Sequence, residues 1–203
     1  MDLFNNDPVV NILPHDGIAD YYGKIMPREK ADFYLRTFLE NLAWKNDEAL
    51  IAGKHFVTAR KVAWYAGKEF PYTYSGTTKH ATVWTPELLQ LKKITEEISG
   101  FTYNSCLANL YHNGEEGMAY HSDDEKALDR NAIASLTFGA ERKFLFKHKR
   151  TKEMVSVILE HGSLLVMRGD TQANWMHRLP PTKKVTRPRV NLTFRTILAP
   201  ENL

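Results

Sequence analysis

A histidine and an aspartate two positions apart, His121 and Asp123, are the residues of this sequence best suited to binding a metal ion. On an extended chain, residues two apart point the same way, so both side chains can hold one ion. A second histidine, His177, follows in a β-rich stretch. Two histidines and one carboxylate on one face of a metal leave open positions, which suits non-haem Fe(II). A polar surface loop and a hydrogen-bonded histidine would show the same residues, so the spacing alone leaves both interpretations open.

A polar strand face near the C-terminus could bind an anion beside such a metal. Alternation along residues 189–196 separates a polar face from a mainly apolar one. The polar face carries Arg189, Asn191, Thr193 and Arg195. Two arginines in a cavity need an anion to neutralise them, and a guanidinium pairs with a carboxylate through two parallel hydrogen bonds. An edge strand with solvated arginines is the alternative, and it is favoured only if no metal site lies upstream.

Two helices and a series of short strands must position these residues. The first helix begins near Pro27 and spaces apolar side chains four positions apart. The second is capped by Thr85 and ends at Gly100. We expect both helices on one side of a sheet.

From about residue 103 the hydrophobic period changes to two, which is typical of strands. After the first of these strands, further short β-rich runs follow at Ala132–Phe138, Lys143–Lys147, Met154–Leu159, Ser163–Met167 and Val190–Leu198. Several short strands with close turns predict a β-sandwich or jelly roll.

The composition is that of a globular protein. The chain has 203 residues, of which 43% are hydrophobic and 25% charged, so one domain with a buried core is expected. It contains no apolar run of ~18 residues that could span a membrane, and its first residues lack a signal-peptide pattern. The single cysteine, Cys106, indicates a reducing compartment. We therefore expect a monomer that is cytoplasmic or nuclear, is not secreted and has no membrane partner.

Basic residues are concentrated in one part of the chain. Residues 126–189 hold 14 basic and 5 acidic side chains, and residues 142–152 hold six cations and no acid. This distribution is expected of a protein that binds a polyanion, and phosphate contacts would position a nucleic acid without specifying its sequence. A solvated strand-and-loop face explains the charges equally well.

The stretch RPRVNLTFR at residues 187–195 is similar to the AlkB-family signature R-x-N-L-T-F-R, which matches from Arg189 through Arg195. Further motifs follow the order and spacing of that family: Asn109-x-Tyr111, His121-x-Asp123, Gly162-Ser163-Leu164-Leu165 and His177. The chain thus resembles an Fe(II)/2-oxoglutarate-dependent dioxygenase of the AlkB type over roughly residues 50–198.

The resemblance implies an α+β fold that is mainly β, with a double-stranded β-helix (jelly-roll) core, flanking N-terminal helices and a nucleotide-recognition lid. Residues 1–203 would form one catalytic domain, with the extension, helices and lid in about residues 1–100 and the core in about residues 101–203.

The resemblance also assigns the cofactor ligands. His121, Asp123 and His177 would hold Fe(II), Arg189 would pair with the distal carboxylate of 2-oxoglutarate, and O2 would be the second co-substrate. The other side chains expected around the co-substrate are Asn109, Tyr111, Asn191, Thr193 and Arg195.

The implied reaction is oxidative demethylation of bases of the 1-methyladenine or 3-methylcytosine type in DNA, with release of formaldehyde. It would repair alkylated DNA directly. A base inside a duplex is unreachable, so the enzyme must flip it out or act on single strands. Tyr74 matches the family's stacking aromatic, and the His121 ring would form the opposite wall. Tyr72, Arg60 and Glu125 are further candidates for substrate contact, although simple packing or solvation explains each of them too.

The expected lid places a small residue, Ala52, where some duplex-repairing relatives have a bulky wedge. Wedges are apolar side chains that are pushed into a base step. Single-stranded DNA or RNA is therefore as plausible a substrate as duplex DNA.

Four alternatives stay open at this point. The protein could be an RNA demethylase, or its dioxygenase site could act on a methylated protein or lipid. It could also be a catalytically silent nucleic-acid-binding module or a zinc-type cupin hydrolase. The silent module predicts a missing metal ligand or arginine, and neither is missing from the sequence.

Overall fold

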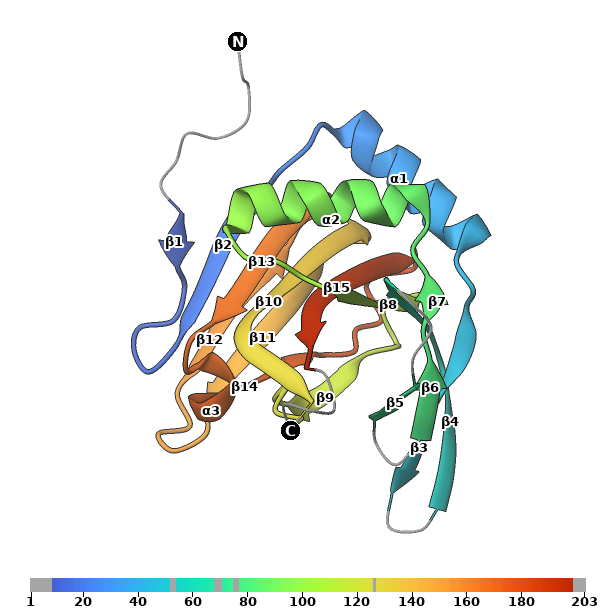
Figure 1. The fold of residues 1–203 in the computed structure, drawn as a ribbon. Coiled ribbons are helices and arrows are strands. Elements are labelled where there is room, and N and C mark those ends of the chain that lie inside the picture. Colours follow the sequence, from blue (N-terminus) through green and yellow to red (C-terminus); the bar gives the residue numbers. More distant parts are fainter. Residues whose placement is uncertain (1–8, 52–53, 68–70, 75–76, 126, 199–203) are drawn as a thin grey trace.

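The computed structural model describes residues 9–51, 54–67, 71–74, 77–125 and 127–198. They form a nine-stranded sheet, a four-stranded sheet and the two-stranded pair β5–β6, with the two long helices on one side of the largest sheet (Figure 1). In the first half of the chain the elements are β1 (Val10–Asn11), β2 (Ile18–Lys24), α1 (Arg28–Asn41), β3 (Lys45–Ile51), β4 (Lys54–Ala66), β5 (Pro71–Tyr74), β6 (Thr77–His80), β7 (Thr82–Val83) and α2 (Pro86–Ser99). The second half holds β8 (Ser105–Tyr111), β9 (Met118–His121), β10 (Leu128–Gly139), β11 (Arg142–His148), β12 (Met154–Leu159), β13 (Ser163–Arg168), α3 (Thr171–Asn174), β14 (Trp175–Leu179) and β15 (Arg189–Ile197). This architecture confirms the predicted jelly-roll fold.

The larger sheet has the strand order β1-β2-β13-β10-β15-β8-β4-β3, with β7 paired to β4. Strands β2 and β4 come from the first hundred residues, and they pair with β13 and β8 of the second hundred. The smaller sheet has the order β12-β11-β14-β9. Its strands come entirely from the C-terminal half of the chain, and its last two strands carry His177 and His121, with Asp123 two residues after β9.

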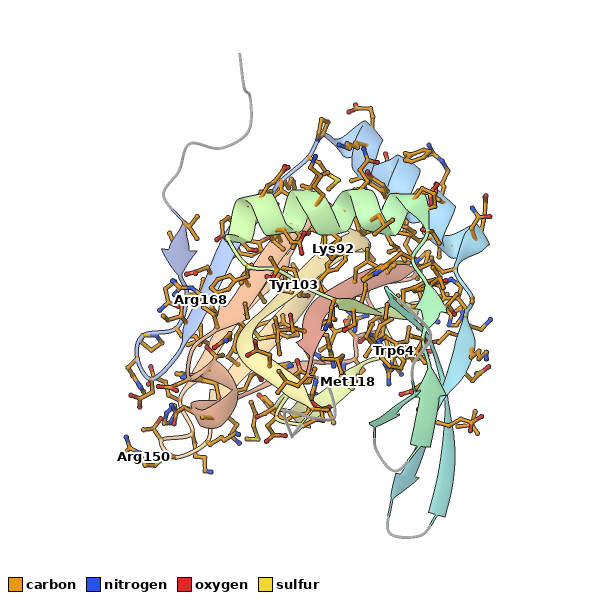
Figure 2. The ribbon with its side chains drawn as sticks, in the orientation of Figure 1. Trp64, Lys92, Tyr103, Met118, Arg150 and Arg168 are labelled. Atoms are coloured by element: carbon orange, nitrogen blue, oxygen red, sulfur yellow. The ribbon has the colours of Figure 1, made fainter. Side chains whose placement is uncertain are left out.

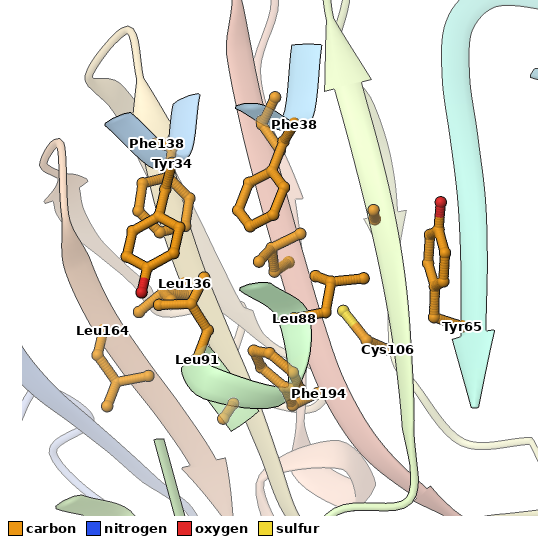
Figure 3. Packing of buried hydrophobic residues seen from close by; sticks show 14 of the residues in the cluster. Tyr34, Phe38, Tyr65, Leu88, Leu91, Cys106, Leu136, Phe138, Leu164 and Phe194 are labelled. Carbon is orange, nitrogen blue, oxygen red and sulfur yellow. The ribbon is translucent and has the colours of Figure 1, made fainter. Parts of the chain in front are cut away.

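The outer core lies between the two long helices and the larger sheet. Helix α1 contributes Tyr34 and Phe38, and helix α2 contributes Leu88 and Leu91, each at most 1% exposed. Figure 3 shows these side chains pointing at the sheet, where Phe138 and Phe194 meet them. Since one apolar face of each helix is buried in this way, the helices hold the outer side of the sheet and leave its other face to the interior.

The local signals that delimit α2 act as the sequence predicts. The hydroxyl oxygen of Thr85 accepts a hydrogen bond from the backbone N–H of Leu88 at 3.3 Å. The helix ends at Gly100, whose φ of 75° is a left-handed conformation that glycine adopts without a steric cost. These two residues fix the length of the helix that contributes Leu88 and Leu91 to the outer core.

The inner core lies between the two sheets. Ile133 of β10 and Leu165 of β13 face Phe146 of β11 and Trp175 of β14, and none of the four side chains is exposed. The aromatic residues fill one end of the space between the sheets. The other end holds a cleft lined by polar and apolar side chains, and the candidate site lies there.

A long hairpin projects from the edge of the larger sheet, where Figure 1 shows β3 and β4 extending away from the body. The C-terminal half of β4 pairs with β8, whereas its N-terminal half, among the described residues, pairs with β3 and not with β8. The antiparallel pair β5–β6 lies beside this hairpin. Ala52, the residue on which the wedge argument rests, lies outside the described residues.

The structure also contains strands that the sequence patterns did not predict, chiefly β2, β9 and β14. Each is short or mixed in polarity, so an alternating pattern is weak there. Among the described residues, no helix is long and apolar enough to cross a membrane.

Candidate active site

Two neighbouring strands of the smaller sheet bring the three predicted metal ligands together. His121 at the end of β9 is the register partner of His177 on β14, and their ring centroids lie 4.3 Å apart. Asp123 follows β9 directly, with its Oδ2 atom 3.7 Å from Nε2 of His177. The candidate ligand atoms of the three residues all lie within 4.8 Å of one another. One metal ion can therefore contact all three side chains.

The protonation states of the two histidines suit metal binding. Nδ1 of His121 lies 2.9 Å from the carbonyl oxygen of Ala119. A carbonyl only accepts, so Nδ1 carries the proton and Nε2 keeps a free lone pair, the usual arrangement of a ligating histidine. Burial lowers the pKa of His177 to about 3, so that this ring is neutral near pH 7 and can also donate a lone pair.

The carboxylate of Asp123 is held in its charged form inside the protein. Burial raises its pKa, but the nearby Arg195 and the two histidines outweigh burial, so the net pKa is lowered. Nη2 of Arg195 lies 3.6 Å from Oδ1. The backbone N–H of Asp123 donates to Oε1 of Gln172 at 2.9 Å. Gln172 is 2% exposed and lies in α3, a position to which no sequence pattern pointed. A buried, ionised and backbone-anchored carboxylate is a suitable third ligand.

A second His–Asp–His cluster joins the N-terminal loop to the β11–β12 turn and contains His15, Asp16 and His148. Nδ1 of His148 accepts a hydrogen bond from the backbone N–H of Thr151 at 3.0 Å, so Nε2 carries the proton in the neutral ring. Both ring nitrogens of His15 contact carboxylates, Glu153 at 2.9 Å and Asp16 at 3.2 Å. The hydrogen bond to Glu153 raises the pKa of His15. Protonated nitrogens cannot bind a metal, so this cluster fits an ion-pair network.

A buried arginine lies on the larger sheet, opposite the metal ligands. Arg189 is 3% exposed, and its Nη2 donates to Oγ1 of Thr137 at 2.9 Å and to Oδ1 of Asn191 at 2.6 Å. Its Nε is buried without a hydrogen-bond partner among the described residues. Burial lowers the pKa of Arg189 to about 10, which still leaves it charged near pH 7. An unsatisfied buried cation favours an anionic ligand, and a carboxylate of 2-oxoglutarate meets that need.

The other residues predicted around the co-substrate come from the same two strands. Register pairs join Arg189 to Tyr111 and Asn191 to Asn109 across β15 and β8. The Arg189 guanidinium lies 5.5 Å from the centre of the Tyr111 ring. Nδ2 of Asn191 donates to Oγ1 of Thr193 at 3.0 Å, so these two side chains bind each other and support Arg189.

A cleft connects the metal ligands to Arg189. Its polar wall contains Arg189, Asn109 and Tyr111, with Asn191, Thr193 and Arg195 beside them. Apolar side chains that include Phe144, Met118 and Leu179 line the remainder. Phe144 stacks on the His177 ring with the centroids 5.5 Å apart. The metal ligands therefore face a space that is partly shielded from water.

The residues predicted to contact the substrate have different surroundings in the structure. Arg60 lines the cleft, but its guanidinium is bound to Asp47 and Asn109. Burial raises the pKa of Glu125, and its Oε2 is buried with no hydrogen-bond partner in the described part of the chain. Tyr72 and Tyr74 lie on β5, and their side chains are outside the described set.

The basic segment is divided between the interior and the surface. Arg142 is 2% exposed and donates to the backbone carbonyls of residues 113, 114, 116 and 180 at 2.8–3.3 Å. It thus fixes the loops beside β9 and β14, and it is not available to phosphates. Lys149 donates to the carbonyl oxygen of Gln172 at 2.8 Å. Arg150 projects from the outer tip of the β11–β12 turn (Figure 2) and is 80% exposed.

The jelly roll, the His–Asp–His cluster and the buried arginine together define an oxygenase of the Fe(II)/2-oxoglutarate type. The profile of the 2OG-Fe(II) oxygenase superfamily matches residues 19–195. The solved structure of OsALKBH1 shares the fold, with a TM-score of 0.63 and 14% identity over 93% of this chain and all of that chain.

Two curated relatives show to which family of these oxygenases the chain belongs. The alpha-ketoglutarate-dependent dioxygenase alkB homolog 3 of Homo sapiens is 41% identical over 180 residues, which are 83% of this chain and 62% of the relative. The DNA oxidative demethylase ALKBH2 of Mus musculus is 36% identical over 195 residues, 90% of this chain and 82% of the relative. The chain thus belongs to the AlkB family, whose cofactors are Fe(II), 2-oxoglutarate and O2. It spans only 62% of the length of alkB homolog 3.

Proposed function

We propose that this protein is an Fe(II)/2-oxoglutarate-dependent dioxygenase that demethylates 1-methyladenine and 3-methylcytosine in DNA and releases formaldehyde. The observation that supports this most directly is the pairing of two sites in one cleft. His121, Asp123 and His177 form a metal-competent cluster, and Arg189 is a buried cation whose Nε has no hydrogen-bond partner among the described residues. The names of the two relatives, a dioxygenase and a DNA oxidative demethylase, support the same reaction.

The cofactors would be held by residues that the fold keeps rigid. Nε2 of His121, the carboxylate of Asp123 and a nitrogen of His177 would bind Fe(II). Arg189 would bind the distal carboxylate of 2-oxoglutarate, with Tyr111 and Asn109 as further hydrogen-bonding groups. The bound metal, with 2-oxoglutarate and O2, supplies the oxidation of an N-methyl C–H bond; the resulting hemiaminal loses formaldehyde.

The chain itself would supply orientation and charge. Arg195 keeps the Asp123 carboxylate ionised, so that one anion and the two histidine rings would face a divalent cation. Phe144 and Met118 line the cleft with apolar surface, which excludes water and side reactions during oxidation. Thr137 and Asn191 fix the Arg189 guanidinium before the co-substrate arrives.

The substrate would reach the cleft as a flipped or single-stranded base, since a stacked base cannot approach the metal. The β3–β4 hairpin contributes Asp47, Arg60 and Val62 to the lining of the cleft, and β5 with Tyr72 and Tyr74 pairs with β6, which contacts β3. These contacts support a base held on the hairpin side of the cleft. With Ala52 at the proposed wedge position, we favour single-stranded DNA over duplex, and RNA is a second candidate polymer.

The direct test is mass spectrometry of matched oligonucleotides incubated with the protein, Fe(II), 2-oxoglutarate, ascorbate and O2. The set would carry one methylated base in single-stranded DNA, duplex DNA or RNA. We expect loss of one methyl mass that requires 2-oxoglutarate and is strongest on single-stranded DNA. Asp123→Ala should abolish the reaction, whereas the exposed neighbour variant Asp124→Ala should retain it. If succinate forms without loss of methyl from any oligonucleotide, the substrate class is wrong.

A further inference from the structure

An irregularity in the β3–β4 hairpin directs an ion pair into the cleft. The register of the ladder shifts between Asn46 and Glu48, and Asp47 and Arg60 lie in that stretch on opposite strands. Bulges of this kind re-aim side chains that regular pleating would place elsewhere. A hydrogen bond from Nδ2 of Asn46 to the carbonyl oxygen of Thr58 (2.9 Å) stabilises the irregular segment.

The Arg60 guanidinium connects the hairpin to the co-substrate side of the cleft. Its Nη2 pairs with Oδ2 of Asp47, and its Nη1 donates to Oδ1 of Asn109. The exposed fractions are 5% for Asp47, 8% for Arg60 and 6% for Asn109. Asn109 lies on β8 between Val62 of β4 and Asn191 of β15. Arg60 thus links Asp47 of the hairpin to Asn109 of β8, the strand that pairs with β15 and its Arg189.

This contact fixes which end of the Asn109 amide faces the cleft. Because Arg60 can only donate, it holds the oxygen of the amide and leaves Nδ2 as the group available to a ligand. Nδ2 makes no hydrogen bond within the part of the chain that the structure describes. A carboxylate ligand needs donors, so the orientation that Arg60 imposes is the productive one. A flipped amide would present its oxygen to the anion and repel it.

We propose that Arg60 is a positioning residue for the 2-oxoglutarate subsite, acting through Asn109, and that Asp47 holds Arg60 in place. This proposal rests on the oxygenase part of the proposed function and is independent of the nucleic-acid substrate. It changes the interpretation of Arg60 as a substrate contact, because both terminal nitrogens already bind protein side chains.

A double-mutant cycle on co-substrate affinity tests the proposal. The dissociation constant of 2-oxoglutarate is measured by calorimetry without O2, using Mn(II) in place of Fe(II), for the wild type, Arg60→Ala, Asn109→Ala and the double variant. We expect each single change to weaken binding about tenfold, the effect of one hydrogen bond. The double variant should lose less than about twofold more, because both changes remove the same interaction.

Two controls separate this role from a structural one. Lys61→Ala removes the neighbouring cation on β4 and should leave 2-oxoglutarate affinity unchanged. If Arg60→Ala does not fold, the cycle is run with Arg60→Lys, whose single ammonium group cannot reproduce a fork between Asp47 and Asn109.

Other outcomes would overturn the proposal. Additive losses in the cycle would show that Arg60 and Asn109 act independently. An Arg60→Ala protein that binds 2-oxoglutarate normally but binds methylated single-stranded oligonucleotide more weakly would make Arg60 a substrate contact. Neither result bears on the proposed demethylation, which fails only if the wild type leaves every methylated oligonucleotide unchanged.

Discussion

Gln172 should control metal affinity although it does not touch the metal. Its Oε1 accepts the hydrogen bond from the backbone N–H of Asp123 at 2.9 Å, and its side chain is 2% exposed. Gln172→Met preserves the length of the side chain and removes the acceptor. The N–H of Asp123 then stays buried without a partner, at a cost of about 1–3 kcal/mol. If the loop moves to relieve that cost, the carboxylate leaves its position beside His177.

An energy in that range corresponds to roughly a 5- to 150-fold change in an equilibrium constant. Loss of a partner that orients a ligand typically weakens metal binding about 10- to 100-fold. We therefore expect Gln172→Met to raise the dissociation constant of Co(II) or Fe(II) by more than about tenfold, measured anaerobically by competition with a fluorescent chelator.

Lys149→Met provides the matched control, because it removes the hydrogen bond to the backbone carbonyl of Gln172 and leaves the contact with Asp123 intact. Its metal affinity should equal that of the wild type. The reasoning is refuted if Gln172→Met binds metal as tightly as the wild type while its melting temperature falls. That result would mean that Gln172 stabilises the fold and does not orient the ligand.

Three further changes test other parts of the structure. Arg189→Lys should weaken 2-oxoglutarate binding about 10- to 100-fold in the same calorimetric titration, and an unchanged affinity would place the distal carboxylate elsewhere. Arg142→Met removes the hydrogen bonds to four backbone carbonyls and should lower the free energy of unfolding by about 3 kcal/mol in urea titrations; a loss below about 1 kcal/mol would contradict that role. The hydrogen bond to Glu153 raises the pKa of His15 above 6.5, so its stabilisation is complete below pH 6.5 and is lost as the pH rises through the raised value. His15→Gln should therefore lower the melting temperature at about pH 6 and have no effect at about pH 9; equal losses at both values would rule out this titration.

Sequence patterns predicted the features that are set by interactions between residues close together in the sequence. The alternation of polar and apolar residues predicted that Arg189 and Asn191 lie on one face of β15, and the structure has them there. Side chains of a strand point alternately to its two faces, whatever packs against the strand. Thr85 and Gly100 marked the ends of α2 because capping acts within a few residues of the helix terminus.

Contacts between residues far apart in the sequence could not be predicted from sequence patterns. The pairing of Asp47 with Arg60 depends on a register shift in the β3–β4 ladder, and a bulge cannot be read from hydrophobic periodicity. Arg142 belonged to a basic run in the sequence, but it is buried because carbonyls of two loops surround it. Gln172 had no motif, since its role arises from α3 packing against the segment that follows β9. The composition gives the number of charged residues, but only the folded structure shows which of them are buried.

The way β4 is shared between hairpin and sheet bears on how such proteins diversify. Its C-terminal half pairs with β8, whereas its outer half pairs with β3 and, in the part of the chain that is described, not with β8. Mutations in the outer half therefore disturb few of the pairings that hold the catalytic core together. Under the function proposed above, changes in the projecting arm would alter which substrates are accepted while the ligands of the cofactors stay fixed. A related protein would then acquire new substrates through changes in one hairpin, as long as the proposed positioning residue Arg60 is kept.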